Sequence, residues 1–331
     1  MTNYYQTIST AIPAGYALNA KYDFLSVTST GSVGGTGLLL TAQAAVTNHG
    51  ALDALATSDG VDFEGTGSLL NGAGATVYGL IGVASASGGE TGAVTNLGVI
   101  GGVSLGVELY GDSLANGSFT TRAALVTGAT GVTAIGETSS IANFGTILGT
   151  GGANTYGVDL GDGSLANGAA ADTTALVSGY QAGVNAGAYA AVANFGTIQA
   201  TGEYGAGVLQ DISGGGTLRV VNGSLGGHAA LIAGTNGVSI LEPGTVINFG
   251  AILCLAGGSS YYAVRLIDGG QVTNGAPSDP GALLAGYNGV FLGVSGAVAN
   301  FGAIEADNFA VRFTGVGALT NGSAGDQKAL I

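Results

Sequence analysis

The stretch that decides the fold runs from Val192 to Ile198 and reads Val-Ala-Asn-Phe-Gly-Thr-Ile. Close copies of it recur along the chain, and their asparagines are Asn48, Asn96, Asn143, Asn194, Asn248 and Asn300. An Asn-Gly pair after a short apolar stretch falls between the copies, and its asparagines are Asn71, Asn116, Asn167, Asn222, Asn274 and Asn321. Together the two sets are spaced by about 25 residues, a period that is typical of solenoids.

Each repeat also carries two later apolar segments that are separated by Gly-rich corners. Examples are Ala175-Leu-Val177 followed by Gly183-Val184, and Gly157-Val-Asp-Leu160 in the neighbouring type of repeat. Three short strands per repeat is the number expected for one coil of a β-helix. The sequence therefore predicts an all-β fold, a right-handed parallel β-helix (a β-solenoid) of about 12–13 coils.

The repeated asparagines are expected to form a ladder. Strand alternation places Val46, Asn48, Gly50 and Leu52 on one face, whose apolar members fill the lumen. Identical amides stacked coil on coil can donate and accept along the axis, and Asn or the following Gly can adopt a left-handed corner. A role of Asn as a ligand for an ion or a sugar is the alternative.

Composition agrees with a β-rich core and excludes two other classes. The 331 residues include 65 Gly and only 4 Pro, and 46% are hydrophobic. Disordered chains are less hydrophobic, and collagen needs Gly at every third position with abundant Pro. The remaining interpretation is an apolar β-fold with Gly at many tight corners.

The net charge is −14, and the six basic residues are few and scattered. Nucleic acids and anionic membranes would be repelled, so neither is expected as a partner. Cys254 is the single cysteine, which excludes an intrachain disulfide. The first residues show no secretion signal, and no apolar run predicts a membrane span.

The Val192–Ile198 pattern, with Gly-Val-x-Leu strands between its copies, resembles the passenger domains of autotransporters and filamentous-haemagglutinin-type secreted proteins. The resemblance covers about residues 43–331, and residues 1–42 do not follow the repeat. It implies an extracellular or cell-surface location, by a route that the sequence does not show, and it implies adhesion or fibre formation more often than catalysis. The segment 1–42 is expected to be an N-terminal cap or an oligomerisation segment.

The sequence predicts no catalytic, cofactor-binding or metal-binding residues. His49 and His228 lie about seven coils apart, too far to share a site. Gly102-Val-Ser104-Leu-Gly106 matches the nucleophile-elbow pattern, but nothing around it reads as the strand-turn-helix that this pattern needs. A polysaccharide-acting β-helix enzyme is the alternative, which would need clustered carboxylates or a basic residue beside a cation.

One acidic series is a candidate for calcium. It comprises Asp112, Asp162, Asp211 and Asp268. Each residue precedes the Asn-Gly of its repeat, so neighbours would lie two coils, or roughly 9.6 Å, apart. A regular column of this kind is also what a solvated turn position produces.

Two further columns are expected on the surface. The residue after Gly-Val is acidic early in the chain (Asp62, Glu108, Asp159) and basic late (Arg265, Arg312). It forms either a solvated strand face or a polarised edge that pairs neighbouring molecules. The second column comprises Leu97, Phe144, Phe195, Phe249 and Phe301. It points away from the asparagines, and forms either a corner folded over its own coil or a lateral interface.

The last repeat stops at Ala329-Leu330-Ile331, before the strand that follows this segment elsewhere. An open coil exposes unpaired backbone groups, which template strand addition. The predicted head-to-tail interface comprises Tyr4, Tyr5, Ile8, Ile12, Ala329, Leu330 and Ile331. We therefore expect a self-assembling extracellular fibre, with a glycan-binding or surface-binding adhesin as the alternative. A chain that continues beyond Ile331 would also explain the open coil.

Overall fold

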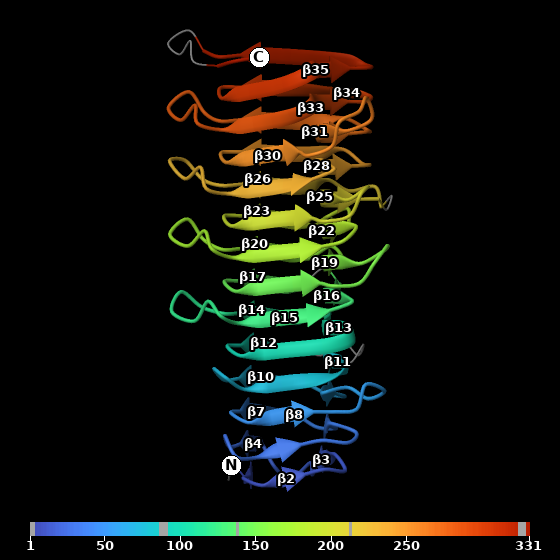
Figure 1. Ribbon diagram of the computed structural model, residues 1–331, viewed down its shortest axis with the longest axis vertical. Helices are drawn as coiled ribbons and strands as arrows, with labels where there is room; N and C mark the ends of the chain where they lie inside the picture. The colour runs from blue at the N-terminus through green and yellow to red at the C-terminus, as the bar shows by residue number, and fades with distance from the viewer. Residues whose placement is uncertain (1–3, 86–91, 137–138, 212–213, 324–328) are drawn as a thin grey trace.

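The computed structural model describes residues 4–85, 92–136, 139–211, 214–323 and 329–331. These residues form strands and turns, without a helix. The chain winds upward as a stack of coils, with its two ends at opposite ends of a rod (Figure 1). This confirms the predicted parallel β-solenoid, since every pairing between the named strands is parallel.

Each coil contributes one strand to each of three faces. The first face is a sheet of fourteen strands, and it carries the repeated asparagines. Its strands are β1 (Tyr5–Ile8), β4 (Phe24–Val27), β7 (Ala44–Asn48), β10 (Gly67–Asn71), β12 (Ala93–Asn96), β14 (Ser113–Asn116), β17 (Ser140–Asn143), β20 (Ser164–Asn167), β23 (Ala191–Asn194), β26 (Leu218–Asn222), β29 (Gly244–Asn248), β32 (Gly270–Asn274), β34 (Ser295–Asn300) and β36 (Val316–Asn321).

The second and third faces follow in the same order within every coil. The second face contains β2 (Ala11–Ile12), β5 (Ser32–Val33), β8 (Ala51–Asp53), β15 (Leu125–Gly128), β18 (Thr146–Gly149), β21 (Leu176–Gly179), β24 (Thr197–Ala200), β27 (Leu231–Gly234) and β30 (Ala251–Cys254). The third face contains β3 (Tyr16–Leu18), β6 (Leu38–Leu40), β9 (Val61–Phe63), β16 (Thr130–Ile135), β19 (Tyr156–Leu160), β22 (Ala182–Ala186), β25 (Ala206–Gln210), β28 (Asn236–Ile240) and β31 (Tyr262–Leu266). Four long strands run through the bend and belong to both faces: β11 (Thr76–Ser85), β13 (Val99–Tyr110), β33 (Leu283–Leu292) and β35 (Ala303–Phe313).

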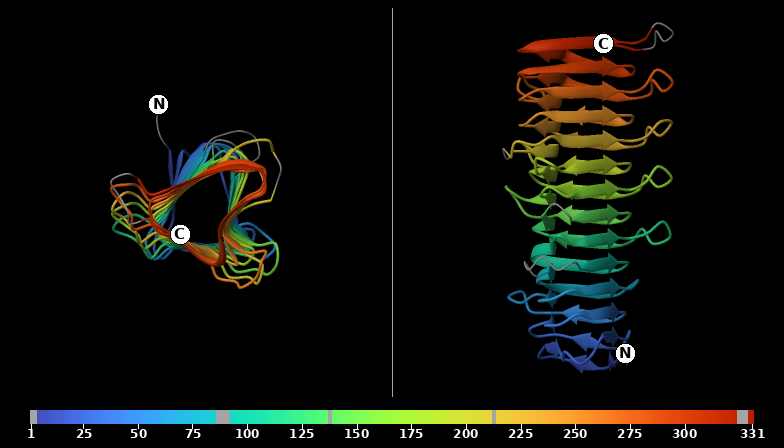
Figure 2. Two further views of the ribbon diagram at one scale, coloured as in Figure 1. Left: turned by 90° about the horizontal axis from the view of Figure 1, so that it is seen from above. Right: turned by 180° about the vertical axis from the view of Figure 1, so that it is seen from behind.

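Seen along the axis, the coils superpose as a closed three-sided outline with loops at the corners (Figure 2). Alternate side chains of each strand point inward, and they form one continuous apolar core. Val192, Ile198 and Val208 supply the three faces of one coil, and each is almost fully buried. Burial of a Val or Ile side chain stabilises the fold by about 1.5–3 kcal/mol, so the stack is held together mainly by its lumen.

The solenoid begins earlier than the repeat predicts. Strand β1 pairs with β4, and β4 pairs with β7, in the same sheet as the later coils. Residues 5–42 therefore form two coils of the rod, and position 42 is not a boundary of the solenoid. The asparagine column is occupied there by Ile8 and Val27, which is why the Asn-based repeat did not reveal these coils. A role of this end in capping or oligomerisation stays a prediction.

Glycine residues adopt the left-handed backbone conformation at the corner that follows many of the ladder asparagines. Gly117, Gly168, Gly223, Gly275 and Gly322 follow ladder asparagines and have φ between 75° and 83°. Asn154 is the one non-glycine with positive φ in the described part of the chain, and it lies outside the ladder. The ladder asparagines themselves are strand residues, so their repetition reflects their side chains.

Candidate functional surfaces

The twelve asparagines stack in a single ladder on the inner side of the first face, and all but the last, Asn321, are buried. Eleven side-chain hydrogen bonds of 2.7–2.9 Å join consecutive members from Asn48 to Asn321. Each amide from Asn48 to Asn300 also donates to a backbone carbonyl, as Asn194 does to Leu231 at 3.0 Å. The amide N–H groups therefore have partners within the rod, which a buried amide requires.

The ladder has a direction and two different ends. Every amide donates to the asparagine of the next coil toward the C-terminal end. The ladder therefore begins at the side-chain oxygen of Asn48 and ends at the side-chain N–H groups of Asn321. The Asn48 oxygen accepts the N–H of Gly50, and Val27 occupies the place below it. The Asn321 amide has no acceptor among the described residues. The C-terminal end of the ladder is thus a donor directed along the axis.

The C-terminal end of the rod is open. All residues of β36 are exposed, and Leu319, which lies over the buried Val298, is 46% exposed. Leu330 begins the next strand of the second face, where its N–H donates to Gly302 at 2.9 Å. Leu330 and Ile331 are exposed and Ala329 is half-buried, as a predicted interface at this end requires.

The N-terminal end is partly closed by its own first coil. Tyr4 and Tyr5 are exposed, and the Tyr5 ring stacks on Phe24 with centroids 4.8 Å apart. Ile8 is 3% exposed and belongs to the core, and Ile12 is partly buried against the core. Ile8 is therefore not part of an interface surface, contrary to the prediction, because strand alternation turns it into the lumen of its own coil.

The phenylalanine line is half-buried. Phe144, Phe195, Phe249 and Phe301 each point away from the lumen and are neither covered nor fully exposed. Phe144 packs against Phe119 of the loop below, with ring centroids 4.8 Å apart. A loop thus covers part of this line, and a lateral interface through the remaining rings stays a prediction.

Loops at one corner form ion pairs that the repeat did not reveal. Four loops project there at every second coil, each closed by an antiparallel bridge (Figure 1). Arg122 contacts the buried Asp172 at 2.9 Å, and His228 contacts Asp279 at 2.9 Å. The pairing could have been found by aligning the loops, since a basic residue in one loop alternates with an aspartate in the next.

Asp172 is strongly held by these contacts. Its carboxylate accepts hydrogen bonds from the backbone and side chain of Thr174 as well as from Arg122. Burial alone would raise the pKa of Asp172, but Thr174 and Arg122 together hold that pKa below its ordinary value.

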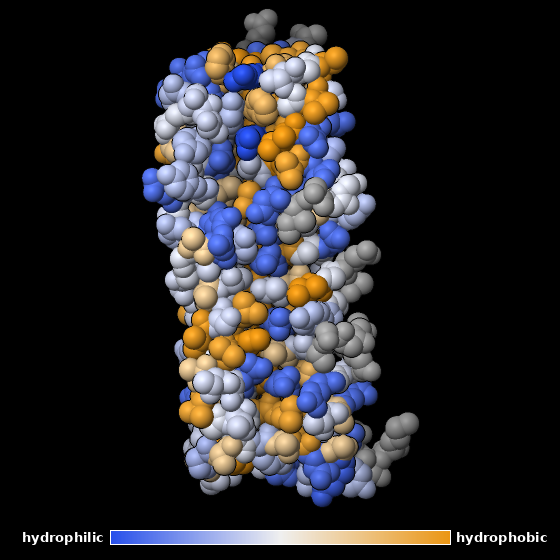
Figure 3. Space-filling model, turned by 90° about the vertical axis from the view of Figure 1, so that its right-hand side faces the viewer, coloured by the Kyte–Doolittle hydropathy of each residue, from blue (hydrophilic) through white to orange (hydrophobic). Residues whose placement is uncertain are grey.

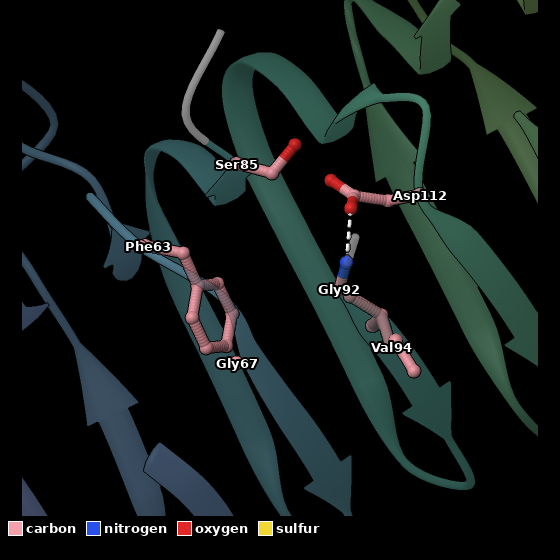
Figure 4. A pocket seen from close by; sticks show the side chains of 8 residues that line it. Phe63, Gly67, Ser85, Gly92, Val94 and Asp112 are labelled. Atoms are coloured by element: carbon pink, nitrogen blue, oxygen red, sulfur yellow. Dashed lines mark hydrogen bonds between the residues drawn. The ribbon is translucent and has the colours of Figure 1, made fainter. Parts of the chain in front are cut away.

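The four aspartates proposed for calcium do not share one environment. Asp112 is buried beside Phe63 and Ser85 at a cavity of about 10 Å³, which is room for about one water molecule (Figure 4). One of its oxygens accepts the N–H of Gly92, and the other is buried and has no hydrogen-bond partner among the residues that the structure describes.

The remaining members of that series are more open. Asp162 accepts the N–H of Tyr189 at 3.0 Å, and Asp211 and Asp268 are exposed. Within the described ranges, no three His, Cys, Asp or Glu side chains are placed to hold a metal together. Two of the four carboxylates instead tie neighbouring coils together at a corner.

The outward residues of the third face form what we call the charged column. On successive coils it comprises Asp62, Ala84, Glu108, Thr133, Asp159, Asn185, Leu209, Ser239, Arg265, Phe291 and Arg312. The side of the rod that carries these strands exposes hydrophilic and hydrophobic side chains along its whole length (Figure 3). The predicted change from acidic to basic therefore follows one straight line of strand positions.

The charges of this column form no ion pair among the described residues. Neither the Arg122–Asp172 ion pair nor the His228–Asp279 contact involves Asp62, Glu108, Asp159, Arg265 or Arg312. Burial raises the pKa of all three acidic side chains. Arg312 lies over the rings of Phe291 and Phe309, at 5.9 and 5.6 Å from their centroids.

The residues considered for catalysis lie apart. Ser104 is exposed within β13, a strand without a following helix. His49 is exposed near the N-terminal end, whereas His228 belongs to the third of the four corner loops. The structure therefore gathers none of these residues into one place.

Neither a search of the described residues for membrane-spanning helices nor comparisons with known proteins gave a match. No helix in the described ranges is both long and apolar enough to cross a membrane. No protein-family model, curated protein or solved structure matches the chain.

Proposed function

We propose that this protein is a structural building block that stacks end to end into an extracellular fibre or surface layer. The observation that carries the proposal is the exposed strand β36, on which the asparagine ladder ends in the Asn321 amide, a donor without an acceptor among the described residues. An exposed strand edge with apolar side chains favours the addition of another strand.

The physical gain from stacking lies in the lumen. Leu319 points along the column of Val298 and is only half covered. A further coil would bury it, at about 25 cal/mol for each Å² of apolar surface removed from water. It would also pair the backbone N–H and C=O groups on the free edge of β36, just as each inner strand of this sheet is paired along both of its edges.

Strand β1 of a second copy offers a surface of the right kind. Tyr4 and Tyr5 are exposed there, and Gln6 lies on the lumen side by strand alternation. If β1 stacks on β36 with a shift of two residues, Gln6 lies opposite Asn321 and its carbonyl can accept the unused donor. Such a contact joins two different surfaces, so it propagates as a filament unless it closes into a ring.

A glycan-binding adhesin is the second candidate function. Three exposed tyrosines of the middle coils favour it: Tyr180, Tyr189 and Tyr204. Exposed aromatic rings present a flat apolar face with a polar edge, and such groups are enriched at binding surfaces.

A pair of variants in β36 tests the stacking proposal. Leu319→Asp places a charge over the lumen, whereas Thr320→Asp places the same charge on the outer side of the same strand. We expect the wild type to form long assemblies whose sedimentation coefficient rises with concentration, Leu319→Asp to remain a single rod, and Thr320→Asp to assemble. Equal behaviour of all three proteins would contradict the proposal.

A further inference from the structure

The charges of the charged column are arranged so that an inverted copy of the column would place basic residues opposite acidic ones. Counting coils from Leu209, Asp159 lies two coils below and Arg265 two coils above. Glu108 lies four coils below and Arg312 four coils above. Acidic and basic residues are therefore placed at equal distances on either side of one residue.

We propose that this face binds the same face of a second copy, running antiparallel, about a two-fold axis at Leu209. The axis brings Asp159 opposite Arg265 and Glu108 opposite Arg312. Because the interface is isologous, each pair occurs twice, which gives four ion pairs. This contact lies on the side of the rod and does not rest on stacking at its ends.

The neutral residues of the column fit the same register. Asn185 and Ser239 lie one coil below and above Leu209, so the axis places them opposite each other. The Asn185 side-chain oxygen is buried and has no hydrogen-bond partner within the described part of the chain. The Ser239 hydroxyl of the second copy can donate to it, directly or through one water, since both side chains are recessed.

An exposed aromatic residue lies beside the proposed axis. Tyr204 is 74% exposed and precedes β25, the strand that carries Leu209. The axis brings Tyr204 close to its own copy and Leu209 opposite Leu209. Large aromatic side chains at the centre of an interface supply much of its binding energy, and the surrounding ion pairs fix the register.

The competing register sets a carboxylate against an apolar side chain. An axis at Asn185 would pair Asp62 with Arg312 and Glu108 with Arg265, as many ion pairs as the proposed axis gives, but it would also place Asp159 against Leu209. The proposed axis leaves only Asp62 without a partner, beyond the last strand of the second copy and in contact with water. An unpaired carboxylate at an interface costs more than a paired one gains. Parallel rods without a stagger would set like charges opposite each other along the whole column.

A charge swap tests the contact. One variant carries Arg265→Glu and Arg312→Glu, and the other carries Glu108→Arg and Asp159→Arg. We expect the wild type to contain pairs of rods by sedimentation velocity, each variant alone to lose them, and an equimolar mixture to regain them as heterodimers. A wild type without pairs, or variants that pair as the wild type does, would overturn the proposal.

Cross-linking tests the orientation and the register. Leu209→Cys puts a thiol at the proposed axis, whereas Asn185→Cys puts one at the axis of the competing register. Under mild oxidation we expect a disulfide-linked dimer from Leu209→Cys and none from Asn185→Cys. The unchanged chain is the control, since its only thiol, Cys254, is buried. A dimer from Asn185→Cys alone, or from neither variant, would overturn the proposed arrangement.

The two contacts are distinguishable in solution. Leu319→Asp removes the end contact and leaves the column intact, so it should still form cross-linked dimers through Leu209→Cys. Loss of that cross-link in the Leu319→Asp background would show that lateral pairing depends on stacking, contrary to the inference.

Discussion

At the scale of single residues, the ladder shows why one amide recurs twelve times. A buried amide without partners would destabilise each coil, but stacked copies satisfy one another and the adjacent backbone. Asn194, for example, accepts from Asn167 and donates to Asn222 and to the Leu231 carbonyl. The Asn side chains thus add hydrogen bonds between neighbouring coils to those that the paired strands already make through their backbones.

Replacing an inner ladder residue should destabilise the rod. Asn194→Ala leaves the Asn222 oxygen without its amide donor and removes the bond to Leu231. Each buried group left unpaired costs about 1–3 kcal/mol, so we expect a loss of roughly 2–4 kcal/mol in the free energy of unfolding. Urea unfolding at pH 7 measures it.

The matched control for this prediction is Asn321→Ala. Asn321 ends the ladder, is exposed and accepts one bond from Asn300. Its replacement should cost less than about 1 kcal/mol. An equal loss from both substitutions would show that burial within the ladder does not determine the cost.

Asp172 should make stability depend on pH in acid. Its folded pKa lies below the ordinary value of 3.8, so the folded state binds its proton less readily than the unfolded state. The carboxylate therefore contributes stability that is present above pH 3.8 and is lost as pH falls through the lower, folded pKa. Asp172→Asn should be less stable than the wild type at pH 7, and the difference in melting temperature should shrink in acid below that value. A difference that is independent of pH would contradict this.

At the scale of elements, three short strands and their corners repeat so regularly that sequence alone predicts the coil. Spacing gives the period, and alternation identifies Val192 and Ile198 as core residues, which the structure bears out. The first two coils could not be found in this way, because Ile8 and Val27 replace the asparagine that marks later coils. The Arg122–Asp172 contact was also missed, because its two residues are 50 positions apart and the repeat was read from the strands and not from an alignment of the loops.

The phenylalanine line and the corner loops should be coupled where they touch. Phe119 and Phe144 form a tilted aromatic pair, and such pairs contribute about 0.5–1.5 kcal/mol beyond simple burial. A double-mutant cycle with Phe119→Ala and Phe144→Ala should return a coupling of this size in thermal or urea unfolding. Phe119→Ala combined with Phe195→Ala should be additive, because Phe195 lies three coils above the coil that carries Phe119. Additivity in the first cycle would show that the ring contact contributes nothing.

At the scale of the whole molecule, fourteen strands in the first sheet make a stiff rod that ends in two different surfaces. Core packing and the ladder explain its stability, while the open end and the charged column are the surfaces that we propose for contacts with further copies. The proposed end contact would lengthen an assembly, and the proposed lateral contact would pair two rods. The sequence predicts both surfaces but not their exact members, because these depend on which side chains remain uncovered after the coils have stacked.

Electron microscopy of the concentrated 331-residue chain tests the central claim, that the rods stack end to end, most directly. Thirteen steps between the fourteen strands, at about 4.8 Å each, give a rod of about 62 Å before the junction is added. The account predicts unbranched filaments with an axial repeat slightly above that length, and none from Leu319→Asp. Separate rods at every concentration, or filaments that Leu319→Asp leaves unchanged, would contradict it.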